Sequence, residues 1–427
     1  MPPSTSAGAR PASSRLRHSR RRFHVLDILR KRRMWRRRSE LKPSYGVVII
    51  GGGSHGLATA YYLRKLGITN VAILEKSYIG SGAAGRNTTI LRSNYKTAEG
   101  ARFYDASVKL YEGLSQDLNF NLMFSQCGHL TLAHTDRAKF VMANRAEGNR
   151  LQGIDSRLIG PEEIKKLAPA MVVDEHATYP IQAALYHPPG GIIRHDAVVW
   201  GLARGADAGG AEIHPYTEVT GIDRSNGSVS GVRTNRGTIR TGTVLNCTAG
   251  WSSLISDMAG VPLPITTHIL QAMVTEPVKP LLDVVIVSSQ MHVYISQTDR
   301  GEFLMGAEIE PWTTYRMNGT LNFLQDVTRH ALELFPQLER ARILRSWAGL
   351  CDLSPDYSPI LGKTEVEGFH VSAGWGTYGF KAAPIVGHTL AELVATGRTP
   401  DLIAPFKLER FYEDRLVSEL AAAAVSH

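Results

Sequence analysis

The fold of this chain is decided by residues 47–75, which read VVIIGGGSHGLATAYYLRKLGITNVAILE. The first four residues are apolar, as in a strand buried on both faces of a parallel sheet. A G-x-G-x-x-G pattern occupies residues 51–56, and apolar residues at helical spacing follow as far as Leu66. A second apolar run ends at Glu75. This order of strand, glycine turn, helix and strand within about 30 residues predicts a βαβ unit.

The glycine turn predicts a dinucleotide-binding site. Gly51 permits a tight turn, Gly53 lets a pyrophosphate approach the backbone, and Gly56 lets the helix pack closely on the strand. The helix N-terminus, which begins at Ser54 and His55, offers unpaired N–H groups to the anion. We therefore expect these five residues to surround the phosphates of a dinucleotide.

Two later segments favour FAD as that dinucleotide. The run Arg86-Asn87-Thr88-Thr89-Ile90 follows the second strand, where FAD enzymes bring a loop across the pyrophosphate and the flavin. A second glycine loop, Gly374–Lys381, precedes a helix with Pro384 in its first turn, where proline is tolerated. A helix N-terminus near the ligand suits a reduced flavin, whose pyrimidine end becomes anionic. Glu75 is placed to accept hydrogen bonds from a ribose 2′-OH. The predicted residues for FAD are Gly51, Gly53, Ser54, His55, Gly56, Glu75, Arg86, Asn87, Thr88, Ile90, Val219, Gly376, Gly379 and Lys381.

The net charge of +9 is concentrated at the N-terminus. Residues 1–44 contain fourteen Arg and Lys but only two acidic residues, so this segment carries +12 and the rest of the chain −3. Ser19–Phe23 resembles a twin-arginine export signal, yet charged residues follow it instead of an apolar stretch. Nucleic-acid binding would require this charge on a folded reading element or between stacking aromatics. We interpret the segment as a basic, partly disordered arm, and a mitochondrial presequence stays open.

The three cysteines, Cys127, Cys247 and Cys351, are far apart and form no C-x-x-C pair. This spacing argues against a disulfide framework and a structural zinc site, and it favours a reducing compartment. No apolar run approaches the roughly 18–20 residues needed to span a bilayer. We therefore expect a soluble, cytoplasmic protein with no metal, no membrane segment and no nucleic-acid partner.

The 427 residues, 43% of them hydrophobic, suffice for two interlocked domains. Patterns along the chain predict a helix at 197–208, a hairpin through 218–238, alternating strands at 265–310 and a helix at 321–335. The predicted fold class is α/β, or α+β overall: a Rossmann-like FAD-binding domain interlocked with a strand-rich substrate domain. The predicted divisions are the arm at 1–44, an FAD-binding domain at 45–110, 190–264 and 345–427, and a substrate or interface domain at 111–189 and 265–344.

Several short motifs accompany the glycine turn along the chain. They are Arg86-Asn87-Thr88-Thr89, Ser93-Asn94-Tyr95, Phe124-Ser125-Gln126, Arg194-His195-Asp196, Trp347-Ala348-Gly349, Ser358-Pro359-Ile360 and Gly374–Lys381. Together they resemble the D-amino-acid-oxidase superfamily, and most closely the beta subunits of heterotetrameric sarcosine oxidases. The resemblance runs from about residue 44 to the C-terminus.

The resemblance implies an assembly with alpha, gamma and delta subunits. FAD bound non-covalently to the beta chain accepts a hydride from sarcosine, which is demethylated to glycine. Electrons then pass to an FMN at the alpha–beta interface, where O2 becomes H2O2. The imine is transferred to tetrahydrofolate on another subunit, giving 5,10-methylenetetrahydrofolate, or hydrolyses to formaldehyde.

The resemblance also assigns roles to three side chains at the substrate. Lys381 falls on the family's lysine at the flavin face, where a substrate carboxylate would compensate a cation at a helix N-terminus. A solvated lysine at the helix end is the alternative. Arg92 matches an arginine that helps to hold the carboxylate, against the alternative of a structural ion pair. Tyr294 is expected to line the pocket or to pack in the core.

A second flavin is implied by the same resemblance. His195 matches the histidine that binds FMN covalently, which requires a neutral imidazole as nucleophile; His187 is its competitor. Cys351 lies near the position of a flavin-bound cysteine in single-chain relatives, but a buried inert thiol is favoured. No lysine occurs in Phe303–Gly306, where single-chain oxidases place an oxygen-activating lysine, which fits oxygen reacting at the FMN.

Two other functions are compatible with these patterns. One is a related FAD-dependent dehydrogenase of proline, hydroxyproline or dimethylglycine, which a peroxide assay and a search for a second, covalent flavin would distinguish. The other is a non-catalytic flavoprotein that binds FAD and partners, for which Lys381, Arg92 and His195 would serve no purpose.

Overall fold

A six-stranded sheet carries the predicted βαβ unit. The computed structural model describes residues 34–36 and 40–419, and the elements below lie in one unit that begins at Trp35. The strand order is β18-β19-β12-β1-β2-β8, and every neighbouring pair is parallel except β18 with β19. The strands are β1 (Val47–Ile50), β2 (Val71–Glu75), β8 (Glu212–Pro215), β12 (Val244–Asn246), β18 (Ile360–Lys363) and β19 (Phe369–Ala373).

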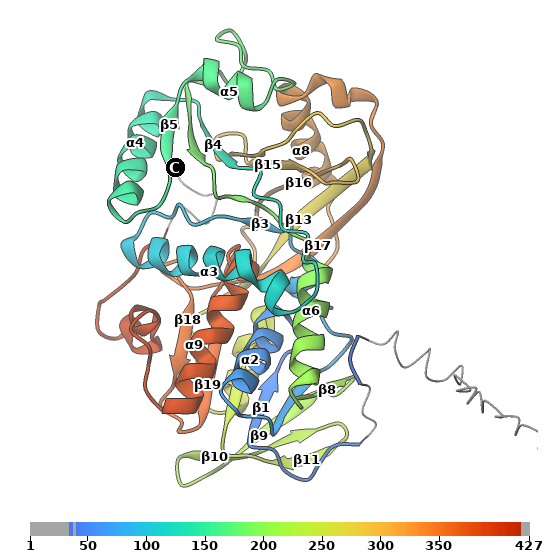
Figure 1. Cartoon of the computed structure of the whole chain (residues 1–427), viewed down its shortest axis with the longest axis vertical. Coiled ribbons are helices and arrows are strands. Elements are labelled where there is room, and N and C mark those ends of the chain that lie inside the picture. Colours follow the sequence, from blue (N-terminus) through green and yellow to red (C-terminus); the bar gives the residue numbers. More distant parts are fainter. Residues whose placement is uncertain (1–33, 37–39, 420–427) are drawn as a thin grey trace, which may run out of the picture. The chain divides into compact units, whose positions relative to one another are not determined.

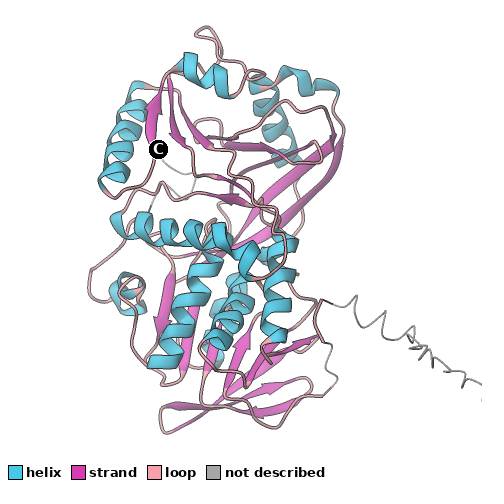
Figure 2. Ribbon diagram, in the orientation of Figure 1, coloured by secondary structure: helices cyan, strands magenta, loops and turns pink. Residues whose placement is uncertain are grey.

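Helices cover one face of this sheet and a small sheet covers the other (Figures 1 and 2). On the first face, α2 packs between α9 and α6, and α3 crosses their ends. Their bounds are α2 (Ser54–Lys65), α3 (Ala98–Asp117), α6 (His195–Ala208) and α9 (Ala383–Thr396). The opposite face packs on β9 (Val219–Ser225), β10 (Ser228–Thr234), β11 (Gly237–Arg240) and α7 (Ser252–Met258). Both faces are buried, which explains why β1 is apolar throughout and β2 is apolar up to Glu75.

An eight-stranded sheet, largely antiparallel, builds the other half of this unit (Figure 1). Its order is β17-β13-β16-β15-β14-β4-β6-β5, with β14 and β4 the one parallel pair. The strands are β4 (His129–Ala133), β5 (Arg157–Ile159), β6 (Ala183–His187), β13 (Thr266–Pro277), β14 (Val285–Ser288), β15 (Val293–Gln297), β16 (Glu302–Ile309) and β17 (Ile343–Leu353). Helices α5 (Pro161–Leu167) and α8 (Leu321–Leu334) pack on one face, and α4 (Asp136–Leu151) packs on β4 and β6 from the other. The short strands β3 (Ile90–Leu91) and β7 (Gly191–Ile192) pair with each other.

The predicted fold class is confirmed, with differences in detail. The expected helices at 197–208 and 321–335 are α6 and α8, and the expected hairpin through 218–238 is formed by β9 and β10, to which β11 adds a third strand. The predicted domain boundary at residue 345 falls inside β17, which pairs with β13 in the eight-stranded sheet. The boundary at 110/111 likewise falls inside α3. The division into domains therefore stays a prediction, and most of the basic arm lies outside the described residues.

Candidate active site

One large cavity, of about 1160 Å³, lies at the carboxyl ends of the parallel strands and reaches the eight-stranded sheet. Ile50, Glu75 and Cys247 line it from β1, from β2 and from the residue after β12. Leu270 and Tyr294 line it from β13 and β15. Ligands of open α/β sheets bind at the carboxyl ends of the strands, so the fold itself places a site here.

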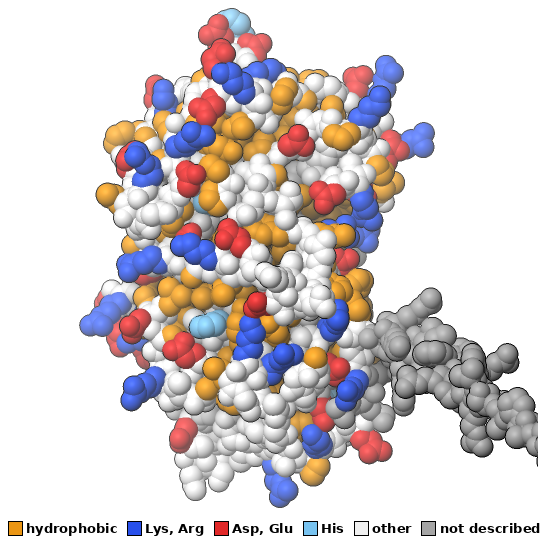
Figure 3. Space-filling view, viewed as in Figure 1, with side chains coloured by type: hydrophobic (Ala, Val, Ile, Leu, Met, Phe, Trp, Pro, Cys, Tyr) orange, Lys and Arg blue, Asp and Glu red, His pale blue; other side chains and the backbone are white. Residues whose placement is uncertain are grey.

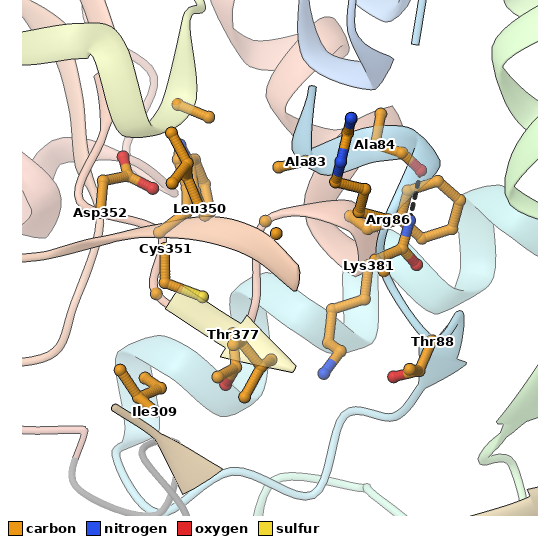
Figure 4. A pocket seen from close by; sticks show the side chains of 18 of the residues that line it. Ala83, Ala84, Arg86, Thr88, Ile309, Leu350, Cys351, Asp352, Thr377 and Lys381 are labelled. Atoms are coloured by element: carbon orange, nitrogen blue, oxygen red, sulfur yellow. Dashed lines mark hydrogen bonds between the residues drawn. The ribbon is translucent and has the colours of Figure 1, made fainter. Parts of the chain in front are cut away.

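Nearly all the predicted site residues meet at this cavity, and Figure 4 labels Arg86, Thr88 and Lys381 among them. They are Gly51, Gly53, Ser54, His55, Glu75, Arg86, Asn87, Thr88, Ile90, Arg92, Val219, Tyr294, Gly376, Gly379 and Lys381. Of the residues predicted to bind a cofactor, Gly56 and His195 are not part of its wall. Gly56 lies behind the turn, and His195 begins α6.

Each glycine of the turn meets a different structural requirement. Gly51 has φ +109°, and a Cβ there would collide with the carbonyl oxygen of Cys247. A Cβ on Gly56 would collide with the Gly51 carbonyl and lie 3.0 Å from Ile49 Cγ2, so its absence permits the close packing of α2 on β1. A Cβ on Gly53 would meet only Ala84 at 3.9 Å. The space beside Gly53 is therefore open to the cavity.

The first turn of α2 lacks the side-chain cap found at the starts of α3, α4 and α8. Thr97, Thr135 and Thr320 accept N–H hydrogen bonds at the starts of α3, α4 and α8. The cap position of α2 is Gly53, which provides no side-chain acceptor, and no acidic residue lies in the first turn. An uncapped helix N-terminus facing a cavity suits a phosphate ligand, because its N–H groups and its dipole favour an anion. The turn fits the pyrophosphate of FAD.

Glu75 is fixed at the other side of the turn. One carboxylate oxygen accepts a hydrogen bond from Gly52 N at 2.9 Å, and the other accepts from Ser77 N at 2.8 Å and Ser81 Oγ at 3.3 Å. These contacts orient the carboxylate in the cavity wall. Its place at the end of β2 fits acceptance of a ribose hydroxyl.

His55 links the glycine turn to the second glycine loop. Its Nε2 lies 2.6 Å from the Gly379 carbonyl oxygen and its Nδ1 lies 3.0 Å from Ser372 Oγ. A carbonyl can only accept, so Nε2 carries the proton and Nδ1 accepts from the hydroxyl. Trp375 Nε1 donates to the same hydroxyl oxygen at 3.0 Å. Burial lowers the pKa of His55 to about 4, so the imidazole stays neutral and acts as a structural link.

Asp352 holds the second glycine loop from β17 and was not predicted from the sequence. Its Oδ2 accepts the Gly374 N–H at 2.6 Å, and its backbone carbonyl accepts the Gly376 N–H at 2.8 Å. Both glycines have positive φ, +69° and +51°. Burial raises the pKa of the Asp352 carboxyl to about 7, although hydrogen bonds from backbone N–H groups lower it. A carboxyl that titrates near neutrality therefore lies in the cavity wall.

Lys381 and Arg92, the two predicted carboxylate-binding residues, both lie in the cavity wall. Lys381 precedes α9 in a short 3-10 helix, and its side chain extends between Thr88 and Thr377 in Figure 4. Arg92 Nη1 donates to Asn94 Oδ1 at 3.0 Å. Burial, with the charge of Arg92 adding to it, lowers the pKa of Lys381 well below its usual value. An anion bound beside these two basic side chains would raise the pKa of Lys381 again and so favour its charged form.

Tyr294 occupies the wall opposite the parallel sheet. A Cβ on its partner Gly306 would collide with the Tyr294 ring, so a glycine on β16 makes room for it. Burial raises the pKa of Tyr294, which keeps the phenol protonated. Cys351 is also buried in the wall, and burial raises the pKa of its thiol, which disfavours a reactive thiolate. The inert role expected for Cys351 agrees with this environment.

The two histidines considered for FMN have different surroundings. His187 is fully buried: its Nδ1 lies 2.6 Å from the Asp155 carbonyl oxygen, and its Nε2 accepts from Ser93 N at 3.2 Å. His195 is half-buried at the N-terminus of α6, outside the cavity. Burial lowers its pKa, with Arg194 and Arg345 opposed by Asp196, so its imidazole is neutral at physiological pH.

These features define a dinucleotide-binding flavoprotein of the oxidoreductase class. The family model described as FAD dependent oxidoreductase (DAO) matches residues 46–393, and the chain belongs to this family. It is 45% identical over 404 residues to the sarcosine oxidase subunit beta of Rhizobium meliloti (strain 1021), which covers 94% of this chain and 97% of the relative. Identity to the protein of the same name from Arthrobacter is 44%, over 91% and 96% of the two chains.

A solved structure supports the same assignment. The crystal structure of L-proline dehydrogenase from P. horikoshii matches with a TM-score of 0.84 at 32% identity, covering 88% of this chain and 100% of the other. The resemblance inferred from the motifs is therefore confirmed, as is an FAD-dependent oxidoreductase fold. Within residues 34–36 and 40–419, no helix is long and apolar enough to cross a membrane.

Proposed function

We propose that this chain is the FAD-binding beta subunit of a multimeric sarcosine oxidase. The observation that carries the proposal is the pair of buried basic side chains, Lys381 and Arg92, in the wall of the same cavity as the predicted FAD-binding segments. The identity of about 45% to bacterial sarcosine oxidase beta subunits over almost the whole chain supports sarcosine as the substrate. We also propose that the protein is cytoplasmic.

The residues of this chain bind and orient the substrate. When bound, FAD supplies the hydride acceptor for oxidation of the C–N bond. Lys381 and Arg92 donate charge-assisted hydrogen bonds to the substrate carboxylate, which fixes the N-methyl group relative to the cavity. The carboxylate also raises the pKa of Lys381, so a proton is held on its Nζ in the complex. Tyr294 closes the wall on the side of β15.

The proposal includes a second flavin and partner subunits. FMN attached to His195 would supply the site where O2 is reduced to H2O2, at an interface with the alpha subunit. The neutral, half-buried imidazole fits a nucleophile. Trp200 on α6 and Leu344 beside Arg345 are exposed apolar side chains that suit a partner surface. Gamma and delta subunits complete the assembly, and the imine yields formaldehyde or 5,10-methylenetetrahydrofolate on a partner.

The function is tested by co-expressing this chain with its partner subunits and reducing the FAD with sarcosine without oxygen. Lys381→Ala and Arg92→Ala should each weaken sarcosine binding by about ten- to hundredfold, because a lost bond to a charged group costs about 1.5–3 kcal/mol. FAD content should not change. Lys363→Ala is the control, since this exposed lysine donates to the Gly397 carbonyl at the end of the sheet away from the cavity. Unchanged reduction in both cavity variants would overturn the carboxylate-binding role.

A dehydrogenase of proline, hydroxyproline or dimethylglycine is the second candidate. The TM-score of 0.84 to an L-proline dehydrogenase favours it, since a carboxylate site suits any small amino acid. Comparing flavin reduction by sarcosine, proline, hydroxyproline and dimethylglycine, with peroxide measured in air, separates the two. Fast reduction by proline without peroxide would favour the dehydrogenase.

A further inference from the structure

The loop that carries Arg92 is held by side chains from distant parts of the sequence. It runs from the end of β3 to the start of α3, residues 92–97. Within the loop, Arg92 Nη1 donates to Asn94 Oδ1 at 3.0 Å, and the guanidinium lies over the ring of Tyr95, 4.5 Å from its centroid. These local contacts orient the Arg92 side chain relative to its own loop. They do not by themselves fix the loop against the cavity.

Arg145, on α4, holds the middle of the loop. Its Nε donates to the Asn94 carbonyl oxygen at 2.7 Å, and Nη2 donates to the same oxygen. Arg145 also lines the cavity. Burial, together with the charge of Arg92, lowers its pKa to about 10, although Glu419 opposes this shift. Arg145 therefore stays charged at neutral pH and ties α4 to the residue that bonds Arg92.

Glu419 holds the end of the loop. Its carboxylate accepts hydrogen bonds from Lys96 N at 3.0 Å, Thr97 N at 2.8 Å and Thr97 Oγ1 at 2.7 Å. Glu419 is only 2% exposed, although it stands at the end of the described chain. Three bonds to one buried carboxylate are more than capping of α3 requires, because Thr97 already accepts the Gly100 N–H.

The segment that carries Glu419 is itself anchored. Its backbone N–H donates to the Asp356 carbonyl at 3.1 Å, and its carbonyl accepts from Tyr378 Oη at 3.2 Å. Asp356 makes a buried ion pair with Arg410, with bonds of 2.8 and 2.9 Å. Tyr378 belongs to the second glycine loop, three residues before Lys381. The C-terminal segment thus contacts both cation-bearing loops of the cavity.

We propose that Arg145 and Glu419 are positioning residues of the substrate carboxylate site, which fix the 92–97 loop so that Arg92 faces the bound carboxylate. The proposal rests on the function proposed above and adds two residues to it. Because neither residue needs to touch the substrate, their effect should appear in the affinity for a carboxylate and not in the limiting rate of flavin reduction.

The experiment uses the FAD-containing complex and two readouts. The Kd of acetate, a carboxylate without an oxidisable bond, is measured from its perturbation of the flavin absorption spectrum. The apparent Kd of sarcosine and the limiting rate come from anaerobic reduction. Glu419→Gln and Arg145→Lys should each raise both Kd values about tenfold, as expected for one lost bond to a charged group. The limiting rate should change less than about threefold.

Two variants on exposed positions of the same elements serve as controls. Glu413→Gln lies on the C-terminal segment and loses a pair with Lys407, and Arg150→Lys lies on α4 and loses a pair with Glu147. Both should leave the two Kd values within about twofold of the parent, as expected for exposed ion pairs.

The Arg145 variants separate positioning from direct charge. Arg145→Gln and Arg145→Lys should be equally impaired if the paired hydrogen bonds to Asn94 matter, because lysine keeps the charge but lacks the planar guanidinium. Parent-like acetate binding in Arg145→Lys with FAD bound would overturn the proposal, as would parent-like binding in Glu419→Gln. Failure of sarcosine to reduce the parent complex would instead contradict the proposed function, while the acetate measurement would still test these two residues.

Discussion

Asp352 is a residue whose protonation is controlled by its surroundings. It sits in the wall of the cavity, 2% exposed, and bonds the Gly374 N–H from β17. Burial raises the pKa of its carboxyl to about 7, compared with about 3.9 in an unfolded chain. Between those two values the folded protein binds more protons than the unfolded one. Stability contributed by this group is therefore present at low pH and is lost as the pH rises through about 7.

Replacing Asp352 by Asn should remove that pH dependence. The free energy of unfolding of the parent should fall by about 2 kcal/mol more than that of the variant between about pH 5 and pH 7. Urea unfolding of the FAD-free chain at several pH values measures the difference. Asp401→Asn, at an exposed carboxyl, is the control. If the free energies of unfolding of Asp352→Asn and of the parent changed equally with pH, this result would contradict the pKa assigned to the Asp352 carboxyl.

At the scale of elements, the packing of α2 on α9 brings two helix N-termini to one cavity. A Cβ on Gly387, in α9, would lie 2.5 Å from the backbone of Ala58 in α2. Backbone atoms cannot move aside as a side chain can, so the two helices approach closely only because this residue is glycine. The loops before both helices line the cavity, which makes this contact a determinant of the site's geometry.

Gly387→Ala and Gly113→Ala should therefore have opposite effects. Gly387→Ala should destabilise the protein by about 1–3 kcal/mol through overpacking, and FAD occupancy should fall because both helix starts shift. Gly113 lies at an exposed position of α3, with nothing within 4 Å of an added Cβ. Alanine there should stabilise the chain by about 0.5–1 kcal/mol. Thermal unfolding and flavin content measure both, and a neutral Gly387→Ala would show that the helices can separate at little cost.

At the scale of the whole molecule, the net charge is distributed unevenly along the chain. The +12 of residues 1–44 contrasts with −3 for the remainder, and Figure 3 shows acidic and basic side chains intermixed over one face of the described body. The intermixed charges on this face give no strong electrostatic direction to a partner that approaches it. Under the proposed function, a partner subunit that binds to α6 is therefore expected to rely on shape and on apolar contacts with side chains such as Trp200.

The prediction at this scale concerns the second flavin. His195 should carry FMN covalently only when the alpha subunit is present, because His195 lies outside the cavity and needs a second surface to enclose a ligand. Flavin fluorescence on this chain after acid precipitation, and a mass increase on the tryptic peptide with His195, would establish the bond. His195→Asn should abolish it and reduce oxygen consumption, yet sarcosine should still bleach the FAD. An adduct on His187 or Cys351 would disprove the assignment.

The sequence by itself determined the βαβ unit, its glycine turn and the two loops that border the cavity. These features are local: an apolar run, a left-handed backbone at Gly51 and a carboxylate at the end of a strand are encoded within a few residues. Lys381 and Arg92 were identified through the resemblance to the family, because they fall at positions where its members carry a lysine and an arginine. All of these meet at one cavity, although their chemical roles there stay predictions.

Only the tertiary structure decided how the cavity is supported. Arg145 is one of several arginines on α4, and Glu419 is one of several acidic residues near the C-terminus. No sequence pattern distinguishes either residue from these neighbours. Their contacts with the 92–97 loop join residues about 50 and 320 positions apart. The pKa of Asp352 and the pairing of β17 with β13 are decided in the same way. Burial and long-range contacts depend on where the whole chain places each group, and no local pattern specifies them.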